Sequence, residues 1–543
     1  MPLRDSSRKT NMSRSSKRIV VYAIIGIVAI AAVYVSTSAR DVPETDNPVI
    51  STQNDEARAQ LFEQQFCGTN TTANSNAYIR EVVLPSECEM PVGIAVDGAK
   101  VWYVSTKRGI LGSYDNTTGM FAQYEIPSWP TRSLPFTAVP SWLMAWTIKL
   151  DNSSSNNVWF TDQNNTIWRF SQSTGDFEMF KSPAKYPSMI DFDSNGNLYV
   201  IGINSQSLFF GNVSALRNGT SEGFREITLP LEGFSDINPN LITSGGLVVD
   251  NQRNDVWVSL LAFQQKRGQL FQYDSETDRI VRVVDLPQDL GAPVGMELDD
   301  YGKIWVADHG TSTFFNYDPD TDNITRYVTS IASPKIYGGN TPPNAYTLPY
   351  WIEKGANGSL WFNEHTGNKM ARFDTEELVL TEYWVPSQNR AWALCPPEAA
   401  TCGLANVMQF AVDRNNNQLW FSEWTENKIA RLDSTKALPV TVAAPQEVSV
   451  AKGGTVEIRL TLSASSDFTG EMMAAATFMP NGSLGNSTGI FSEQSVSVSS
   501  GSTKDISFTF SAANDLQSGP YTMMLGAGNE EVSSMKAVKV NII

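Results

Sequence analysis

Histidine, cysteine and basic side chains are scarce in this sequence, and each scarcity excludes a class of function. The 543 residues include two histidines and four cysteines, and the formal net charge is −17. Beyond the first 18 residues no Lys/Arg cluster occurs, which argues against nucleic acid as a partner because phosphate neutralisation needs such clusters. The sequence also lacks a Gly-x-Ser-x-Gly elbow, a His-Glu-x-x-His helix and a glycine-rich phosphate loop, so the motifs of common hydrolases, zinc proteases and nucleotide-binding proteins are missing.

Long apolar runs are also rare, and the one that occurs lies near the N-terminus. Residues 1–18 carry six basic side chains and one acid, and the uncharged run 19–36 follows them. Basic residues before the run and acids behind it predict a single-pass signal anchor in the cell membrane, with 1–18 in the cytoplasm and the rest of the chain outside. A signal peptide cleaved after Ala39 is the main alternative, and a buried helix is another. Both the anchor and the signal peptide export the protein.

The four cysteines fall into two locally close pairs, which fits an oxidising compartment. We expect the disulfides Cys67–Cys88 and Cys395–Cys402. A zinc site is the alternative, but the spacing is not the Cys-x-x-Cys of structural zinc sites. Ten Asn-x-Ser/Thr triplets follow the apolar run, and their density predicts a glycosylated surface protein.

A repeat of about 40 residues dominates the middle of the chain. Seven stretches share four short strands, with a strand ending in an aromatic-apolar pair, a strand ending near Tyr-Asp, and a last strand closing on Pro; the clearest are 293–330 and 349–386. This period predicts an all-β protein with a seven-bladed β-propeller over 78–442. Residues 78–85 match the closing strand of the other repeats, so we expect them to complete the last blade and close the ring. An isolated strand with a chance resemblance is the alternative.

The flanking segments differ in composition from the repeats. Residues 37–77 are polar and are interpreted as a tether that contains a short helix. Residues 443–543 have no Trp or Cys, are rich in Ser, Thr, Val and Gly, and alternate over short runs. This pattern predicts a C-terminal immunoglobulin-like β-sandwich that serves as a spacer or adhesion module.

Acids end several of the second strands in the repeats. The sequences WFTD, WVAD, WFNE and WFSE place Asp162, Asp308, Glu364 and Glu423 at these ends, and the two histidines directly follow two of the acids. Equivalent positions in neighbouring blades would gather them around one opening. Oxygen ligands suit Mg²⁺ or Ca²⁺, so Asp308, Glu364 and Glu423 are candidate metal ligands, with His309 and His365 as candidate catalytic acids or bases. The alternative is that the acids only cap turns and meet water.

Three connections between repeats are long enough to build a binding surface. They cover 128–141, 331–348 and 387–403, and they contain aromatic and cationic side chains. The candidate ligand-binding residues at this face are Asp162, Tyr350, Trp351 and Trp392.

The repeats resemble those of the virginiamycin B lyases. The phrases PVGIAVD (91–97), LWFNEHTGNKMARFD (360–374) and QLWFSEWTENKIARLD (418–433) carry the resemblance, which covers roughly 78–442. The resemblance implies a seven-bladed propeller, and, for the lyases themselves, Mg²⁺-assisted elimination at an ester of cyclic streptogramin antibiotics. Related repeats also occur in secreted propellers without lyase activity.

This chain departs from the family at the residues that carry the chemistry. The family's catalytic histidines follow a proline at the start of an inner strand, and the corresponding residues here are Val92, Val294, Tyr350 and Val407. Where the family has a metal-binding Glu before such a proline, this chain has Ala292 or Leu348. Of the metal carboxylates implied by the resemblance, only the one that ends Trp-Phe-x-Glu persists, as Glu364 or Glu423.

Two functions follow as hypotheses. The first is a membrane-anchored binding or adhesion protein that takes an extracellular small molecule, glycan or protein at the channel mouth. The alternative is a divalent-metal-dependent lyase or lactone hydrolase at the same mouth. For the second, Glu297 and Glu353 are a further candidate metal pair, whose other interpretation is solvated charges that line the channel.

Overall fold

The computed structural model describes most of the chain after the predicted tether. The described residues are 72–129, 145–151, 156–162, 164–330, 336, 346–390, 393, 395, 398–399, 402–413, 418–478 and 486–543. The predicted basic segment 1–18, the predicted anchor 19–36 and most of the predicted tether 37–77 lie outside these ranges. Among the residues inside them, no helix has the length and apolar character needed to cross a membrane.

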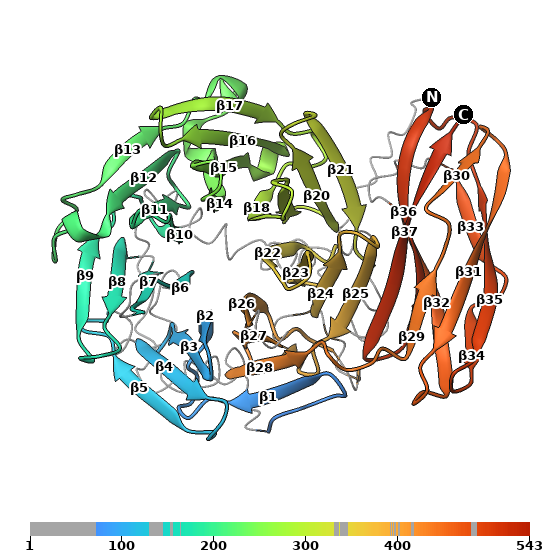
Figure 1. Cartoon of the computed structure of the whole chain (residues 1–543), viewed down its shortest axis with the longest axis horizontal. Coiled ribbons are helices and arrows are strands. Elements are labelled where there is room, and N and C mark those ends of the chain that lie inside the picture. The colour runs from blue at the N-terminus through green and yellow to red at the C-terminus, as the bar shows by residue number, and fades with distance from the viewer. Residues whose placement is uncertain are drawn as a thin grey trace, which may run out of the picture.

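Seven sets of four antiparallel strands form the larger part of the fold, and Figure 1 shows them arranged in a ring. The first four sheets, in chain order, are β2 (Pro91–Asp97), β3 (Lys100–Ser105), β4 (Ile110–Asp115) and β5 (Phe121–Glu125); β6 (Ile148–Leu150), β7 (Val158–Asp162), β8 (Thr166–Phe170) and β9 (Phe177–Lys181); β10 (Pro187–Phe192), β11 (Asn197–Gly202), β12 (Ser207–Asn212) and β13 (Arg225–Thr228); and β14 (Thr243–Asp250), β15 (Asp255–Ala262), β16 (Arg267–Asp274) and β17 (Arg279–Asp285).

The remaining three sheets complete the ring. They are β18 (Pro293–Leu298), β19 (Ile304–Asp308), β20 (Thr313–Asp318) and β21 (Asn323–Val328); β22 (Pro349–Lys354), β23 (Ser359–Glu364), β24 (Lys369–Asp374) and β25 (Val379–Trp384); and β26 (Val407–Asp413), β27 (Gln418–Glu423) and β28 (Lys428–Asp433) with β1 (Ile79–Val83). Short 3-10 turns lie at Val213–Ala215, Glu232–Phe234, Pro239–Leu241 and Phe263–Gln265. The chain is all-β and propeller-like, as the repeat predicted.

The predicted pairing of the N-terminal strand with the last sheet is confirmed. β1 pairs antiparallel with β28, with Ile79 opposite Leu432 and Val83 opposite Lys428. The seventh sheet therefore takes three strands from the end of the ring and its fourth from the beginning. With β1 in place, the last sheet has its fourth, outer strand.

Asp side chains fix many of the turns between strands. At the turn between β10 and β11, Asp193 accepts hydrogen bonds from the backbone of Asn195 (2.9 Å) and Asn197 (2.8 Å), while Gly196 adopts a φ of +77°. At the turn between β16 and β17, Asp274 accepts from Glu276 and Thr277 in the same way. These residues supply the local hydrogen bonds that tight turns need, so the sequence can fold each sheet from local signals.

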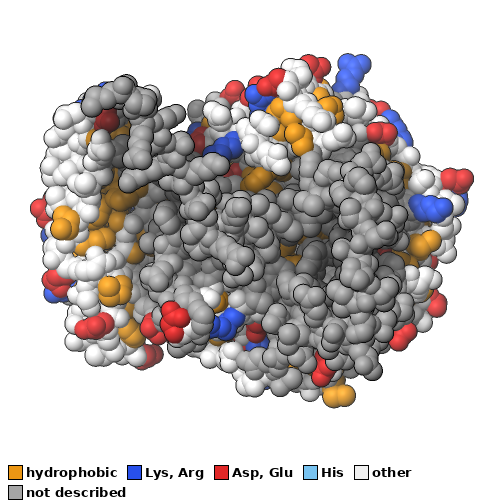
Figure 2. All heavy atoms as spheres, turned by 180° about the vertical axis from the view of Figure 1, so that it is seen from behind, with side chains coloured by type: hydrophobic (Ala, Val, Ile, Leu, Met, Phe, Trp, Pro, Cys, Tyr) orange, Lys and Arg blue, Asp and Glu red, His pale blue; other side chains and the backbone are white. Residues whose placement is uncertain are grey.

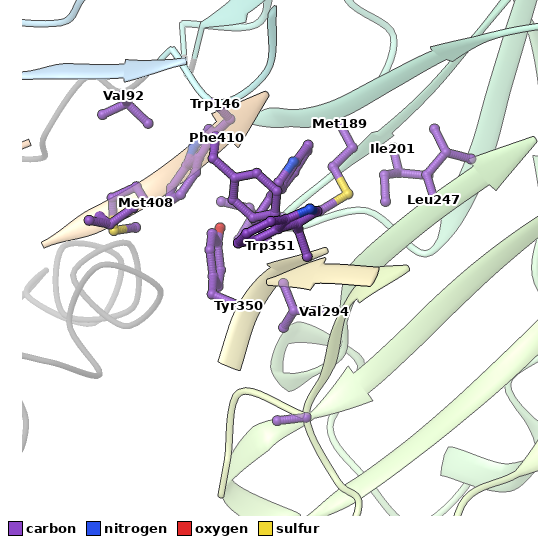
Figure 3. Packing of buried hydrophobic residues seen from close by; sticks show 14 of the residues in the cluster. Val92, Trp146, Met189, Ile201, Leu247, Val294, Tyr350, Trp351, Met408 and Phe410 are labelled. Carbon is purple, nitrogen blue, oxygen red and sulfur yellow. The ribbon is translucent and has the colours of Figure 1, made fainter. Parts of the chain in front are cut away.

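The axis of the ring is packed with apolar side chains. One hydrophobic cluster includes residues from the first strand of nearly every sheet or from just before it, and Figure 3 shows several of them close together. They include Val92, Trp146, Met189, Leu247, Val294, Tyr350, Trp351, Met408 and Phe410. Contacts between aromatic rings join neighbouring sheets as well, for example Trp305 with Phe373 at 5.6 Å. The described residues at the axis are thus a hydrophobic core.

Residues from about 440 onward form strands in two sheets that pack face to face. One contains β29 (Val440–Ala443), β31 (Thr455–Ala464), β33 (Thr488–Phe491) and β35 (Thr503–Ser511), and the other contains β30 (Glu447–Val450), β32 (Gly470–Phe478), β34 (Ser495–Val498), β36 (Gly519–Gly528) and β37 (Val532–Ile542). Apolar side chains from both sheets make one core.

This C-terminal unit is joined to the ring by strand pairing. β25, the outer strand of the sixth sheet, pairs antiparallel with β37 from Val379↔Lys536 to Tyr383↔Val532. The result is one nine-stranded sheet that runs from the ring into the C-terminal unit, and Figure 1 shows β25 beside β37. The sequence pattern did not predict this junction.

The predicted disulfide Cys395–Cys402 is confirmed, with the two Cα atoms 5.6 Å apart. Cys88 is also disulfide-bonded, and its predicted partner Cys67 lies outside the described residues.

Candidate functional site

The four acids at the ends of second strands are all buried, and the side chains around them differ. Glu364 and Glu423 are fully buried, and they stand directly opposite a lysine at the start of the third strand, Glu364 opposite Lys369 and Glu423 opposite Lys428. Asp162 and Asp308 stand opposite a threonine instead. The acids therefore occupy equivalent positions, as predicted, but their environments fall into two kinds.

In the sixth sheet a buried lysine lies between two buried glutamates. Nζ of Lys369 is 3.1 Å from Oε2 of Glu364, 3.3 Å from Oε1 of Glu382 and 2.5 Å from Oγ of Ser330. Glu382 also accepts hydrogen bonds from the backbone of Ser330 and from the hydroxyl of Ser533 in β37. We call these residues, Ser330, Glu364, Lys369 and Glu382, the sixth-sheet cluster.

The two acids of this cluster hold their protons differently. Burial, and then the neighbouring Glu382 carboxylate, raise the pKa of Glu364 well above its usual value. Burial also acts to raise the pKa of Glu382, but Lys369 and the hydrogen bonds outweigh it and lower that pKa to about 2. Burial lowers the pKa of Lys369, but Glu364 and Glu382 reverse this and leave it raised. The pKa values of the two acids therefore move in opposite directions, and Glu364 is the one that holds a proton more readily.

The seventh sheet repeats this arrangement with residues from both ends of the ring. Nζ of Lys428 is 2.7 Å from Oε2 of Glu81 and 2.6 Å from Oγ of Ser387. Glu423 lies beside them, and neither of its oxygens has a hydrogen-bond donor among the described residues. Burial, and then Glu81, raise the pKa of Glu423 well above its usual value. We call Glu81, Ser387, Glu423 and Lys428 the seventh-sheet cluster.

The two clusters correspond residue by residue. Ser330 lies two residues after Val328, the last residue of β21, and Ser387 lies two residues after Val385, which directly follows β25. Glu382 lies on β25 and Glu81 on β1, the fourth strands of the sixth and seventh sheets. A further acid, Glu426, is 3.8 Å from Lys428, and burial raises its pKa to about 7. β1 thus supplies to the seventh sheet the acid that β25 supplies to the sixth.

Asp308 and Asp162 are held by hydrogen bonds from neutral groups. Asp308 accepts from the backbone of Ala292 (2.7 Å) and from the hydroxyl of Thr311 (2.7 Å). Asp162 accepts from the backbone of Asn164 (2.7 Å) and from the indole of Trp168 (2.7 Å). Burial raises the pKa of each carboxyl to about 6. Both acids act here as caps of their turns.

The candidate metal ligands do not fit one divalent cation as they are arranged. Oε2 of Glu364 is 3.1 Å from the ammonium of Lys369, and Glu423 lies in a cluster that already contains Lys428. Both oxygens of Asp308 accept hydrogen bonds, one from Ala292 just before β18 and one from Thr311 just after β19. Within the described ranges, no group of three or more His, Cys, Asp or Glu could hold a metal ion. We derive no step through a metal.

The two histidines do come together. The rings of His309 and His365 stack with centroids 5.4 Å apart and planes 11° apart, and Tyr350 lies 4.8 Å from His309. Nδ1 of His309 is 3.3 Å from the carbonyl oxygen of Pro349, so it carries the proton, and Nε2 of His365 is 3.1 Å from Oδ1 of Asn406. Burial lowers both pKa values, to about 3 for His309 and about 4 for His365, so the pair is neutral at physiological pH.

The candidate ligand-binding residues have a more internal position than the sequence suggested. Trp351 is buried in the axial core (Figure 3), and its indole donates to Glu353 (3.0 Å). Tyr350 packs against both histidines. Asp162 is 1% exposed, and Trp392 lies outside the described residues.

The strand register also changes one alignment. Val407 pairs with Glu423 as Pro349 pairs with Glu364, so Met408 and not Val407 is equivalent to Tyr350.

Glu297 and Glu353 connect neighbouring inner strands. Glu297 accepts a hydrogen bond from the backbone of Lys354 (3.0 Å), and Glu353 accepts one from the backbone of Val412 (3.1 Å). Each acid therefore binds the inner strand of the next sheet. In these positions they join sheets, and both stay half-buried and line a small cavity of about 40 Å³ at the inner strands.

A cavity of about 550 Å³ lies between the fourth and fifth sheets. It opens among the turn after β15, the connection that leads into β18 and the turn after β19. Its walls are Phe263, Lys266, Gln288, Asp289, Gly291, Ala292, Asp308, Gly310, Thr311 and Tyr346. Asp308 is the predicted site residue that contributes to it. Figure 2, from behind, shows charged side chains of both signs scattered around the rim, without a broad basic patch among the coloured residues.

Sequence reasoning missed the lysines and outer-strand acids of the two clusters. A lysine after an Asn turn is typical of a solvated strand end, so Lys369 and Lys428 were not predicted to belong to a site. A signal was present: the phrases NEHTGNK and SEWTENK both place Glu five residues before Lys, and TEYW and REVV both place Glu in the closing strand. Only the pairing of the strands shows that these residues meet.

Comparisons with known proteins give structural matches only. No protein-family model and no curated protein sequence matches the chain. Virginiamycin B lyase from Staphylococcus aureus superposes with a TM-score of 0.47 at 18% identity, covering 65% of this chain and 98% of the other. Hydrazine synthase from Kuenenia stuttgartiensis gives 0.46 at 9% identity, with 65% and 97% covered. YCF48 from Cyanidioschyzon merolae gives 0.43 at 10% identity, with 66% and 100% covered.

Proposed function

We propose that this chain is an extracytoplasmic binding protein, a seven-bladed propeller with an immunoglobulin-like C-terminal unit, tethered to the cell membrane by 19–36. The observation that carries the binding role is the 550 Å³ cavity between the fourth and fifth sheets. Its size is that of a small-molecule site, and it combines aromatic walls with a few polar groups, as ligand pockets do. The ligand therefore binds beside the axis, since the axis itself is filled by apolar side chains.

The cavity has a defined chemistry. Phe263 and Tyr346 offer aromatic surface, and the ammonium of Lys266 has no ion-pair partner among the described residues, whereas Asp289 is paired with Arg326. A cation beside aromatic rings suits a ligand that carries a carboxylate on a ring, such as a uronic acid. Gly291 lets the segment before β18 pack directly against Lys266, because a Cβ there would lie 2.2 Å from the backbone of Lys266.

The binding experiment is ligand-detected NMR on the full chain in detergent, with a panel of neutral sugars, uronic acids and short peptides. We expect saturation transfer to the uronic acids. Lys266→Gln and Phe263→Ala should each weaken binding at least tenfold. Arg225→Gln, on an exposed pair outside the cavity, is the matched control and should bind as the unaltered chain does. No transfer to any member of the panel, or equal binding by Lys266→Gln, would contradict the proposal.

The lyase or hydrolase alternative needs a separate measurement. A turnover screen against cyclic esters and sugar lactones, with and without Mg²⁺, tests it from the substrate side. Glu364→Gln and Glu423→Gln should leave any turnover unchanged if these acids serve only the buried clusters.

A further inference from the structure

The seam where β1 meets β28 holds the components of a condensation reaction. The Lys428 amine and the Glu81 carboxylate lie 2.7 Å apart, and both side chains are fully buried. Glu423 lies next to Glu81, and burial, followed by Glu81, raises the pKa of its carboxyl well above the usual value. Ser387 contacts both reacting groups, at 2.6 Å from Lys428 and 2.9 Å from Glu81. An amine and a carboxyl group held together, with a second acid beside them and little access for water, are the reactants of an amide bond.

Unpartnered oxygens show where the extra proton lies. Oε1 of Glu81 and both oxygens of Glu423 lack a hydrogen-bond donor among the described residues. A proton on Glu423, donated to Oε1 of Glu81, satisfies both side chains, and buried polar atoms rarely stay unpaired. The cluster then contains one ammonium, one carboxylate and one acid. Moving the ammonium proton to Glu81 converts it to one amine and two acids without any exchange with solvent.

The reacting groups are fixed by strand pairing, with Val83 opposite Lys428 and Glu81 two residues away on the same strand. Fixed neighbours of this kind react as if at concentrations on the order of 10⁵ M or more.

We propose that Nζ of Lys428 and Cδ of Glu81 condense to an amide that joins β1 covalently to β28. The amine attacks Cδ while Glu423 donates its proton to the departing hydroxyl group of Glu81. A C–N bond forms, a C–O bond breaks, and one water molecule leaves. The proton released from the nitrogen returns to Glu423, so the acid is regenerated, and no oxidant or other reactant is consumed.

The amide would lie at the point where the ring is closed. β1 has five residues in its pairing with β28, and the chain that enters β1 comes from the N-terminal side, where we propose the membrane tether. The amide would hold this short strand in the seventh sheet by a covalent bond as well as by backbone pairing, and this chemistry does not depend on the proposed tether.

The test is a tryptic digest of the full chain, produced in a host that does not glycosylate it and reduced before mass spectrometry. An amide at Lys428 blocks cleavage there, so peptide 81–100 should be recovered joined to peptide 415–431, lighter than their sum by one water molecule. Lys428→Arg keeps the charge but cannot form the amide, and it should release 81–100 alone. Glu423→Gln removes the proton donor and should lower the joined fraction at least tenfold.

The unaltered chain decides the question by itself if a variant fails to fold. Recovery of peptide 81–100 alone together with a peptide ending at Lys428, in full yield, would overturn the proposal. Joined peptides that persist undiminished in Glu423→Gln would overturn the role of Glu423. Neither result depends on ligand binding, so the binding proposal and this one fail separately.

Discussion

The sixth and seventh sheets contain the same buried cluster built from different parts of the chain. In the sixth sheet Glu364, Lys369 and Glu382 lie within 19 consecutive residues. In the seventh, Glu81 and Lys428 are 347 residues apart in sequence and yet 2.7 Å apart in space. The comparison shows that the position in a sheet decides the chemistry of a residue, whatever the order of the strands along the chain. The ring closes by bringing Glu81 of β1 to the place that Glu382 of β25 occupies in the sixth sheet.

The two clusters differ at the outer strand. Oε2 of Glu382 accepts a hydrogen bond from Ser533 of the C-terminal unit, whereas Oε2 of Glu81 accepts one from the backbone of Asn74. The sixth-sheet cluster therefore depends on the C-terminal unit, and the seventh-sheet cluster depends on the N-terminal segment. Variants in one should leave the other intact.

The largest effects are expected from removal of the buried lysines. Lys369→Met leaves Glu382 as an unpaired buried carboxylate, and Lys428→Met does the same to Glu81, so each should lower the free energy of unfolding by about 3–5 kcal/mol. The measurement is denaturant unfolding of the full chain, followed by tryptophan fluorescence. A loss below about 1 kcal/mol for both would show that the clusters are solvated.

The next effect concerns acid, and it separates the histidine pair from the clusters. His309 and His365 have folded pKa values of about 3 and 4, against about 6.5 in an unfolded chain, so the unfolded state binds more protons below pH 6.5. Stability should be unaffected by these groups above pH 6.5 and fall as the pH drops from 6.5 toward 4. The expected loss is about 3 kcal/mol for each histidine, at 1.36 kcal/mol per pH unit.

Unfolding free energies at pH 7, 5.5 and 4 measure this slope. His365→Gln should flatten it between pH 6.5 and 4. Glu382 acts at lower pH, because its folded pKa of about 2 means that its contribution is present above its unfolded pKa and is lost as the pH falls toward 2. An unchanged slope in His365→Gln would contradict the assignment.

A smaller effect tests the link between the sixth sheet and the C-terminal unit. Ser533→Ala removes one hydrogen bond to the Glu382 carboxylate and should cost about 1.5–3 kcal/mol. In double-mutant cycles its effect should couple to Lys369→Met and add independently to Lys428→Met, because only the first pair shares a cluster. Coupling of equal size in both cycles would mean that the clusters are not independent.

The smallest effect is expected at a surface ion pair. Arg225 and Asp278 are 2.6 Å apart, but both are well exposed. Exposed pairs are screened by water and salt, so Arg225→Met should leave the unfolding midpoint within experimental error. A loss comparable with that of Lys369→Met would show that burial is not what distinguishes the pairs.

The sequence predicted local structure well because each repeat carries its own signals. Turns such as the one at Asp193 and Gly196 fix the hairpins, and the match of 78–85 to the closing strands predicted the pairing of β1 with β28. The long-range junction of β25 with β37 was missed, because an outer strand has no residue pattern that specifies which free edge it will meet.

The site was harder to predict than the fold. The acids at second-strand ends were found, but their partners were not, since Lys369 and Glu382 are ordinary surface residues when only the sequence is considered. The histidines were placed correctly at equivalent positions in adjacent sheets, and the structure stacks them. The axial channel expected from the fold is filled by Trp351, Phe410 and their neighbours, because the size of the side chains at inner strands decides whether a ring has a hole.

The origin of β1 has a consequence for biosynthesis. The strand is made first, and its partner β28 follows only after six sheets have been translated. At about 5–20 residues per second, the 347 residues from Glu81 to Lys428 take on the order of tens of seconds to emerge. During that interval the five residues of β1 form an orphan strand whose best complement has not yet been made. On a polysome, a neighbouring chain that is further along in synthesis presents its own β28 before this chain has made one. Slower translation over 84–428 should therefore raise the fraction of molecules that exchange their first strands.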